Sequence, residues 1–174
     1  LNTPNDVVVK RDGTIWFSDP LYGLINDYEG GRRSSRQPAR VYRFDPNDGS
    51  LTAMTEPSQV VGPNGLAFSP DESLLYVVDT GAPDDPDPER RILVFDVEDG
   101  GGALGEARLF HQVSPGYADG ICVDEEGHVW SSAGDGVHCI APDGHRLGRL
   151  RTPQRVANLC FGGEHCNRLF ICAW

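Results

Sequence analysis

Short apolar runs with a period of two recur along the chain, and turn residues separate them. Each run places its apolar side chains on one face of an extended segment, which is typical of a half-buried strand. Turns such as Asp12-Gly13 and Glu126-Gly127 join the runs in pairs, as in β-hairpins. No stretch shows a sustained helical stripe, so the pattern predicts an all-β chain. The paired runs are 7–9 with 15–17, 66–68 with 74–78, 121–123 with 129–130, and 159–161 with 169–171.

The pairs of runs are copies of one unit. Each unit starts with an Asn or Asp just before its first run, and we call Asn5, Asn64, Asp119 and Asn158 the opening residues. The units open near residues 4, 63, 118 and 157, and the last interval is close to the roughly 40–45 residues of a four-stranded propeller blade. Radial repetition of small antiparallel sheets accounts best for this pattern. We therefore expect residues 1–174 to form a single, partial β-propeller domain.

The repeat also predicts how much of a propeller this chain covers. The sequence begins directly against a strand and stops after the second run of the fourth unit. A propeller must close its ring, because an incomplete blade leaves open edges. We therefore expect N-terminal blades and final strands outside these residues. A compact four-bladed ring is the alternative.

Two insertions lengthen the earlier units. Residues 21–39 include the basic residues Arg32, Arg33 and Arg36, which are candidates to cover a substrate if this long loop acts as a lid. A solvated basic loop is the alternative. Residues 82–89 are acidic and rich in proline, so we expect an extended, exposed loop there.

Composition narrows the class of function. The chain has 174 residues and a formal charge of −11, which disfavours nucleic acid and anionic membranes as partners because both attract basic patches. No apolar run is long enough to span a bilayer. The five cysteines are odd in number and form no Cys-x-x-Cys pair, so a zinc site of that spacing is not expected. Cys122, Cys160 and Cys172 lie within apolar runs, so we expect buried, reduced thiols, which favour a cytoplasmic location.

The opening residues carry the candidate chemistry. In a propeller the first strand of each blade lines the central channel, so Asn5, Asn64, Asp119 and Asn158 are expected to converge at one mouth of it. Amide and carboxylate oxygens are hard ligands that suit Ca²⁺ or Mg²⁺. A cation held by one carboxylate and neutral amides can polarise a carbonyl group and stabilise an oxyanion.

A structural role is the alternative for these residues, because Asn and Asp are common at turns for local hydrogen-bonding reasons. Four in register, with matching neighbours, favour the metal hypothesis. Asp19 and Asp79 end the second strands of their units. For these two we expect support of the ligands from behind, or capping of the strand end, instead of direct ligation. No Gly-x-Ser-x-Gly elbow and no Ser/His/Asp assembly suggests a nucleophilic mechanism.

The ordered motifs resemble those of the SMP-30/regucalcin/gluconolactonase family, and they are most similar to the motifs of its bacterial gluconolactonase branch. The resemblance covers nearly the whole chain apart from the insertions. The matching segments are Pro4-Asn5-Asp6 with Asp12-Gly13-x-Ile15-Trp16-Phe17-x-Asp19-Pro20, Pro63-Asn64-Gly65-Leu66-x-Phe68-Ser69 with Leu75-Tyr76-x-x-Asp79, and Asp119-Gly120 with Gly127-x-Val129-Trp130.

The resemblance implies a six-bladed propeller with one divalent cation at the channel mouth, and it places these units as roughly the third to sixth blades. It implies that Asn64 and Asp119 are direct ligands and that Asn5 is a ligand or a substrate contact. The family's further ligand is a glutamate of the first blade, which no residue here matches. We expect Ca²⁺, with Mg²⁺, Mn²⁺ or Zn²⁺ as alternatives, and we assign a substrate contact to Asn158.

The reaction implied by the resemblance is hydrolysis of an aldonolactone such as glucono-1,5-lactone. The metal or Asp119, acting as a base, would activate the attacking water. Two rivals stay open at this point. One is a metal-dependent esterase or phosphotriesterase, and the other is a non-catalytic propeller that binds a ligand.

Overall fold

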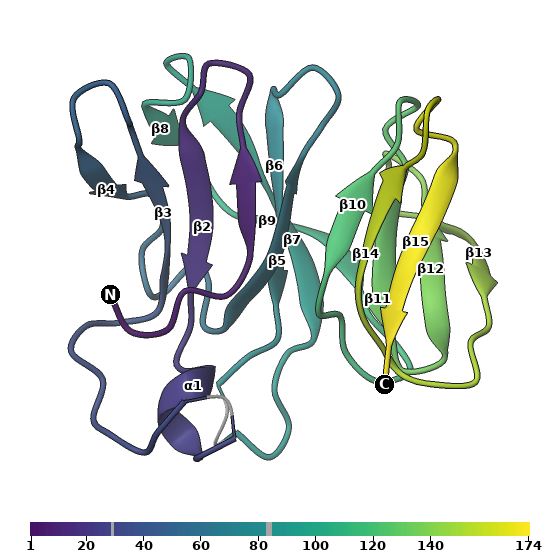
Figure 1. Cartoon of the computed structure of the whole chain (residues 1–174), viewed down its shortest axis with the longest axis horizontal. Coiled ribbons are helices and arrows are strands. Elements are labelled where there is room, and N and C mark those ends of the chain that lie inside the picture. The colour runs from purple at the N-terminus through teal and green to yellow at the C-terminus, as the bar shows by residue number, and fades with distance from the viewer. Residues whose placement is uncertain (29, 83–84) are drawn as a thin grey trace.

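The chain folds into four antiparallel sheets that follow one another in sequence order (Figure 1). The computed structural model describes residues 1–28, 30–82 and 85–174, and nearly all regular structure in these ranges is β-strand. Each sheet corresponds to one of the sequence units. The prediction of an all-β chain is therefore confirmed.

The strands of each sheet are consecutive in the chain. The first sheet contains β1 (Val7–Val9), β2 (Ile15–Asp19), β3 (Arg40–Phe44) and β4 (Leu51–Ala53). The second contains β5 (Pro63–Phe68), β6 (Leu74–Asp79), β7 (Arg91–Glu98), β8 (Ala103–Leu104) and β9 (Arg108–Gln112). The third contains β10 (Ile121–Val123), β11 (Val129–Ala133), β12 (Gly136–Ile140) and β13 (Arg146–Leu150). The fourth contains β14 (Val156–Gly162) and β15 (Arg168–Ala173).

The tight turns between first and second strands depend on glycine. Gly13 and Gly127 have φ values of +88° and +83°, a region that glycine enters without steric cost. The N–H of Gly13 donates to the carbonyl oxygen of Lys10 at 2.9 Å, and that of Gly127 donates to Asp124 at 3.0 Å. The turns expected at these glycines are present, and they fix the register of both hairpins.

Alternation along β6 explains how the sheets pack on one another. Leu75 and Val77 point into the core between the first and second sheets, where they join Trp16. Tyr76 and Val78 point the opposite way, into the core shared with the third sheet. Each such buried side chain contributes about 1.5–3 kcal/mol relative to exposure. A strand that is apolar on both faces is therefore sandwiched between two neighbouring sheets.

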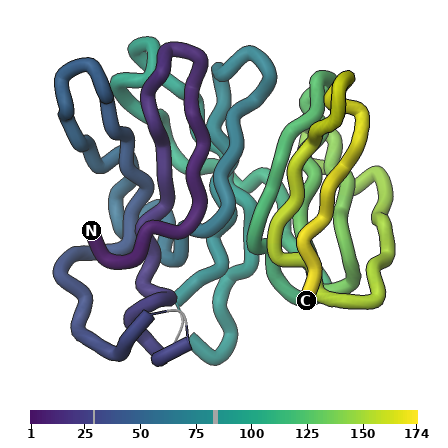
Figure 2. The backbone as a smooth tube through the Cα atoms, viewed as in Figure 1, coloured from purple at the N-terminus to yellow at the C-terminus, as the bar shows by residue number. Residues whose placement is uncertain are grey.

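The first strands lie innermost and the last strands lie outermost. β1 contacts β5, β5 contacts β10, and β10 contacts β14. In contrast, β4 and β13 lie at opposite outer edges, and the backbone trace runs from one side of the molecule to the other as the sequence advances (Figure 2). This is a propeller-like arrangement, as the repeat predicts.

Some details differ from expectation. Cys160 and Cys172, expected to be buried because they lie in apolar runs, are exposed on the fourth sheet, and Cys122 is half-buried. The insertion 21–39 contains one helical turn, α1 (Tyr22–Ile25), and the second sheet gains a fifth strand because both β8 and β9 pair with β7. Glu29 of that insertion, and Pro83 and Asp84 of the acidic loop, lie outside the described residues. In the part of the chain that the structure describes, no helix has the length and apolar character needed to cross a membrane.

Candidate active site

The segments around the opening residues of neighbouring units lie close together. The backbone N–H of Gly65 donates to the carbonyl oxygen of Asp119 at 3.0 Å, and that of Gly120 donates to Ala157 at 2.8 Å. A Cβ atom added at Gly65 would collide with the Asp119 carbonyl, and one at Gly120 would collide with the Asn158 amide. The small residue after each of these opening residues is therefore required by the packing of neighbouring sheets.

A cavity of about 360 Å³ lies where three of the units open. Asn5, Asn64 and Asp119 line it, one from each of the first three units. Side chains of α1 and Trp174 also line it, which places the cavity at the end of the sheets where α1 and the last residue lie (Figure 1). Its volume falls in the range of about 300–1,000 Å³ that is typical of small-molecule sites.

Asn64 has a half-satisfied amide. The residue is only 5% exposed, and its Nδ2 donates to Thr80 Oγ1 at 3.2 Å. Thr80 Oγ1 in turn donates to the carbonyl oxygen of Ala118 at 3.3 Å, which fixes the orientation of the amide. Asn64 Oδ1 is buried and has no hydrogen-bond partner among the described residues. A buried acceptor left unsatisfied costs about 1–3 kcal/mol, so this oxygen is poised for a ligand outside the chain.

Asp119 is held in place by its backbone. Its N–H donates to Ser132 Oγ at 2.7 Å, while its carbonyl oxygen accepts the Gly65 N–H described above. The first bond ties Asp119 to β11 of its own sheet, and the second ties it to β5 of the neighbouring sheet. The partly buried carboxylate is therefore presented to the cavity from a backbone that two sheets fix.

Asp19 and Asp79 organise the segments that lead to Asn5 and Asn64. The buried Asp19 carboxylate accepts the Thr3 N–H at 2.7 Å, and the buried Asp79 carboxylate accepts the Gly62 N–H at 2.8 Å. Thr3 and Gly62 each lie two residues before an opening residue. Neither Asp19 nor Asp79 is among the described residues that line the cavity. Both carboxylates therefore support the loops from behind.

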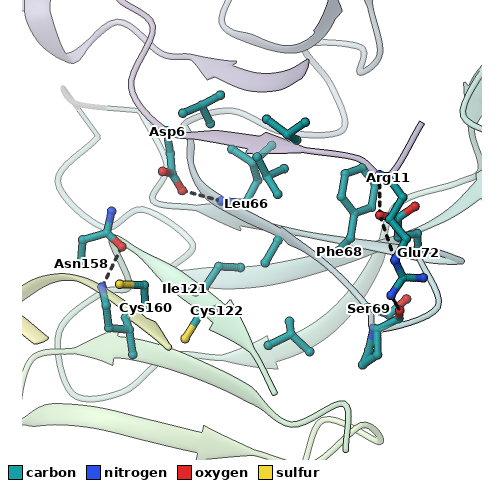
Figure 3. A pocket seen from close by; sticks show the side chains of 17 residues that line it. Asp6, Arg11, Leu66, Phe68, Ser69, Glu72, Ile121, Cys122, Asn158 and Cys160 are labelled. Atoms are coloured by element: carbon teal, nitrogen blue, oxygen red, sulfur yellow. Dashed lines mark hydrogen bonds and ion pairs between the residues drawn. The ribbon is translucent and has the colours of Figure 1, made fainter. Parts of the chain in front are cut away.

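Asn158 is not among the described residues that line this cavity. It is exposed, and its Oδ1 accepts the N–H of Leu159 at 2.7 Å. It lines a second cavity, of about 450 Å³, together with Asp6 and Cys160 (Figure 3). Asn158 therefore lines a different cavity from the other three opening residues. The substrate contact assigned to it stays a prediction.

The structure adds a basic and aromatic wall that the sequence did not indicate. Arg90, Tyr117 and Arg155 line the same cavity as Asn64 and Asp119. Arg155 Cζ lies 4.1 Å from the centroid of the Tyr117 ring, and Arg90 Cζ lies 5.8 Å from it. Burial lowers the pKa of the Arg155 guanidinium. The only signal in the sequence is position, since Tyr117 and Arg155 lie two and three residues before opening residues.

The basic residues of the first insertion are placed differently. Arg32, Arg33 and Arg36 are all exposed, and none of them is among the described residues that line the cavity. The arginines that line the cavity with Asn64 therefore come from segments other than the expected lid.

The donor atoms of the cavity fit a hard cation. Across residues 1–28, 30–82 and 85–174, no three His, Cys, Asp or Glu side chains are grouped so that they could hold a metal ion. The ligands on offer are the amide oxygens of Asn5 and Asn64 and the carboxylate of Asp119. Oxygen donors of this kind suit Ca²⁺ or Mg²⁺. The unsatisfied Asn64 Oδ1 gives this fit an observation independent of residue type.

Comparisons with known proteins identify the family. The sequence profile of the SMP-30/gluconolactonase/LRE-like region matches residues 1–174. A gluconolactonase of Zymomonas mobilis is 35% identical over 181 residues, covering 99% of this chain and 48% of that protein. A solved gluconolactonase from Xanthomonas campestris superposes with a TM-score of 0.88 at 41% identity, covering 99% of this chain and 55% of the other.

A more distant structure has the same architecture. The calcium-binding protein regucalcin from Agrobacterium tumefaciens superposes with a TM-score of 0.75 at 25% identity, covering 97% of this chain and 52% of that one. The chain thus spans about half the length of the relatives it matches. On the full-length match to the family profile, the chain belongs to the SMP-30/gluconolactonase/LRE-like family.

Proposed function

We propose that the full-length protein hydrolyses sugar lactones, with glucono-1,5-lactone as a representative substrate, and that it uses one divalent cation. The observation that carries this proposal is the buried, unsatisfied Oδ1 of Asn64 in a cavity shared with Asn5 and Asp119. The similarity to gluconolactonases supports the substrate class. We also propose that the four sheets belong to a six-bladed propeller.

Asn64 Oδ1, the Asp119 carboxylate and the Asn5 amide oxygen are the groups that would hold the cation, with Ca²⁺ as our first choice. A bound cation supplies Lewis acidity toward the lactone carbonyl group. Thr80 keeps Asn64 Oδ1 available by occupying the amide nitrogen. Asp19 and Asp79 keep the Asn5 and Asn64 loops in register through the backbone bonds described above. These contacts preorganise the site before substrate arrives, which lowers the cost of binding.

Asp119 is proposed to take the proton of the attacking water. A carboxylate has two oxygen atoms, so it can serve as a ligand through one and accept a proton through the other. Attack forms a bond from the water oxygen to the carbonyl carbon. The bond from that carbon to the ring oxygen then breaks, and the ring oxygen leaves as a hydroxyl group after receiving the proton. The product is an open-chain hydroxy acid, so atoms and charge balance.

The test is hydrolysis of glucono-1,5-lactone by the full-length protein, followed by acid release. The protein is assayed as purified, after chelation, and after addition of Ca²⁺, Mg²⁺, Mn²⁺ or Zn²⁺. A buffer blank corrects for spontaneous opening of the lactone. We expect activity to disappear on chelation and to return with at least one cation.

The same assay separates the rival functions. Aryl esters and phosphotriesters are offered in parallel under the metal condition that works best. Faster turnover of either class than of the lactone would overturn the proposed substrate. Full lactonase activity in the chelated protein would overturn the proposed role of the cation.

A further inference from the structure

Two arginines in the candidate active site form no ion pair with a carboxylate of the described residues. Arg90 and Arg155 both line the cavity, and no described carboxylate forms an ion pair with either one. The other arginines for which the described residues show no ion pair are exposed, whereas Arg90 and Arg155 are half-buried. Six other arginines do form ion pairs with carboxylates: Arg11, Arg40, Arg43, Arg91, Arg108 and Arg149.

The guanidinium groups of Arg90 and Arg155 both lie near the ring of Tyr117. Their Cζ atoms lie 4.1 and 5.8 Å from the centroid of its ring, within the roughly 6 Å of a cation–π contact. The two guanidinium groups are therefore no more than about 10 Å apart, which is the screening length in 0.1 M salt. Like charges so close repel each other, and burial lowers the pKa of Arg155 because desolvation acts without a carboxylate to offset it.

An anion placed between the two arginines would relieve that repulsion. A guanidinium presents its N–H donors in a planar fork that matches carboxylate, phosphate and sulfonate oxygens. Arg155 Cζ lies over the Tyr117 ring at 4.1 Å and over the Trp174 ring at 5.6 Å, and cation–π contacts of this kind do not use the guanidinium N–H groups as a carboxylate would. Asp85 also lines the cavity, but it is exposed. The wall is therefore suited to an anionic ligand, although the protein as a whole is strongly acidic.

We propose that Arg90 and Arg155 form an anion-binding subsite, so that the preferred lactones carry a negatively charged substituent remote from the lactone carbonyl. This inference rests on the proposed function, because Asn64 and Asp119 occupy the same cavity and are assigned to the carbonyl end of the substrate. Phosphate, sulfonate and carboxylate substituents share the required chemistry. Arg90 and Arg155 act here as specificity-determining residues.

Equilibrium binding tests the subsite without turnover. Calorimetry on the full-length protein with Ca²⁺ present compares 6-phosphogluconate with gluconate, which differ only in the added phosphate. We expect the phosphorylated acid to bind about 10- to 100-fold more tightly, as expected for charge-assisted hydrogen bonds. Arg155→Gln and Arg90→Gln should each remove most of that preference. Arg151→Gln removes an exposed charge that does not line the cavity, and it should keep the preference.

Kinetics on the corresponding lactones then separates the two proposals. We expect Arg155→Gln to raise KM for 6-phosphoglucono-1,5-lactone by a larger factor than KM for the unsubstituted lactone, whereas Arg151→Gln should leave both KM values unchanged. Equal binding of the two acids by the wild-type protein would overturn the subsite, even if both lactones are hydrolysed. A binding preference that depends on Arg155, without turnover of either lactone, would overturn the hydrolase and leave the anion subsite standing. If Arg155→Gln fails to fold, Arg90→Gln and the wild-type preference decide the question.

Discussion

Asn64 and Asn158 occupy the same position in the second and fourth units, yet their amides are in opposite states. Asn64 is buried, donates through Nδ2 to Thr80, and keeps an Oδ1 that accepts nothing from the described residues. Asn158 is exposed, and its Oδ1 is already occupied by the N–H of Leu159. Only Asn64 shares a cavity with Asn5 and Asp119.

The comparison shows that the repeat sets the position of a residue, whereas its neighbours set its chemistry. Thr80 follows directly after β6 and takes up the amide nitrogen of Asn64, so the oxygen is left for a ligand. Asn158 bonds to the residue that follows it, which consumes the oxygen locally. A side chain that satisfies itself within its own strand is a poorer candidate for a metal ligand.

The largest difference should appear when each amide is removed. We expect Asn64→Ala to weaken cation binding by about 100-fold or more, because even residues behind a ligand typically account for 10- to 100-fold. Asn158→Ala should change cation affinity by less than about threefold. Calorimetric titration of the full-length protein with Ca²⁺ measures both, and lactone hydrolysis should fall in the same order.

Thermal unfolding of both variants is the control for this pair. Neither substitution is expected to prevent folding. Asn158 is exposed, and Asn64→Ala removes a buried oxygen that has no hydrogen-bond partner among the described residues. Equal losses of Ca²⁺ affinity in the two variants would contradict the separation of the two amides. A larger loss for Asn158→Ala would reverse the assignment.

A smaller effect is expected from the carboxylate behind Asn64. Asp79 is 1% exposed, accepts the N–H groups of Gly62 and Gly81, and forms an ion pair with Arg91. Breaking a buried pair of this kind costs about 3–5 kcal/mol of unfolding free energy. We expect Asp79→Ala to show that loss in urea unfolding. Its Ca²⁺ affinity should fall by about tenfold, since the Gly62 loop positions Asn64.

Asp96→Ala is the matched control for Asp79→Ala. Asp96 also pairs with an arginine across adjacent strands, Arg108, but both side chains are about half exposed. Solvent screens such a pair, so little stability should be lost and Ca²⁺ affinity should not change. Equal destabilisation by the two substitutions would show that burial of Asp79 is not what matters.

Much of this architecture follows from sequence because it depends on local rules. Alternation predicts that the side chains of β6 face two different neighbouring sheets, and Asp-Gly and Glu-Gly predict the turns at Gly13 and Gly127. The register of the units also predicts that opening residues converge, which the structure shows for Asn5, Asn64 and Asp119. Predicting these features does not require knowing which loops contact one another in the folded chain.

The rest of the site depends on contacts between irregular segments. Arg155 reaches Tyr117 from a different unit, and no periodicity links the two positions. The exposed arginines of the first insertion were more conspicuous in sequence because they form a cluster, but they lie outside the cavity lining that the structure describes. The sequence also gives no sign that Asn158 differs from the other opening residues, because its hydrogen bond with the N–H of Leu159 depends on backbone geometry.

The smallest expected effect concerns Asp6, whose carboxylate accepts the N–H of Leu66 in the second unit and lines the cavity that contains Asn158. Burial raises the pKa of Asp6 above its ordinary value of 3.8, and hydrogen bonds from Leu66 and Val7 offset only part of this. The folded protein therefore holds this proton more tightly than the unfolded chain does. Stability due to Asp6 should thus fall as pH rises from about 3.8 through the folded pKa.

Asp6→Asn keeps an acceptor for the Leu66 N–H and removes the charge. Its Tm relative to wild type should be highest at neutral pH and should decline toward acid. Asp48→Asn is the control of opposite sign, because hydrogen bonds from Ser50 lower the pKa of the exposed Asp48. Its deficit in Tm should be greatest at neutral pH and should vanish in acid. Differences of the same sign in both variants would show that burial of Asp6 does not control its titration.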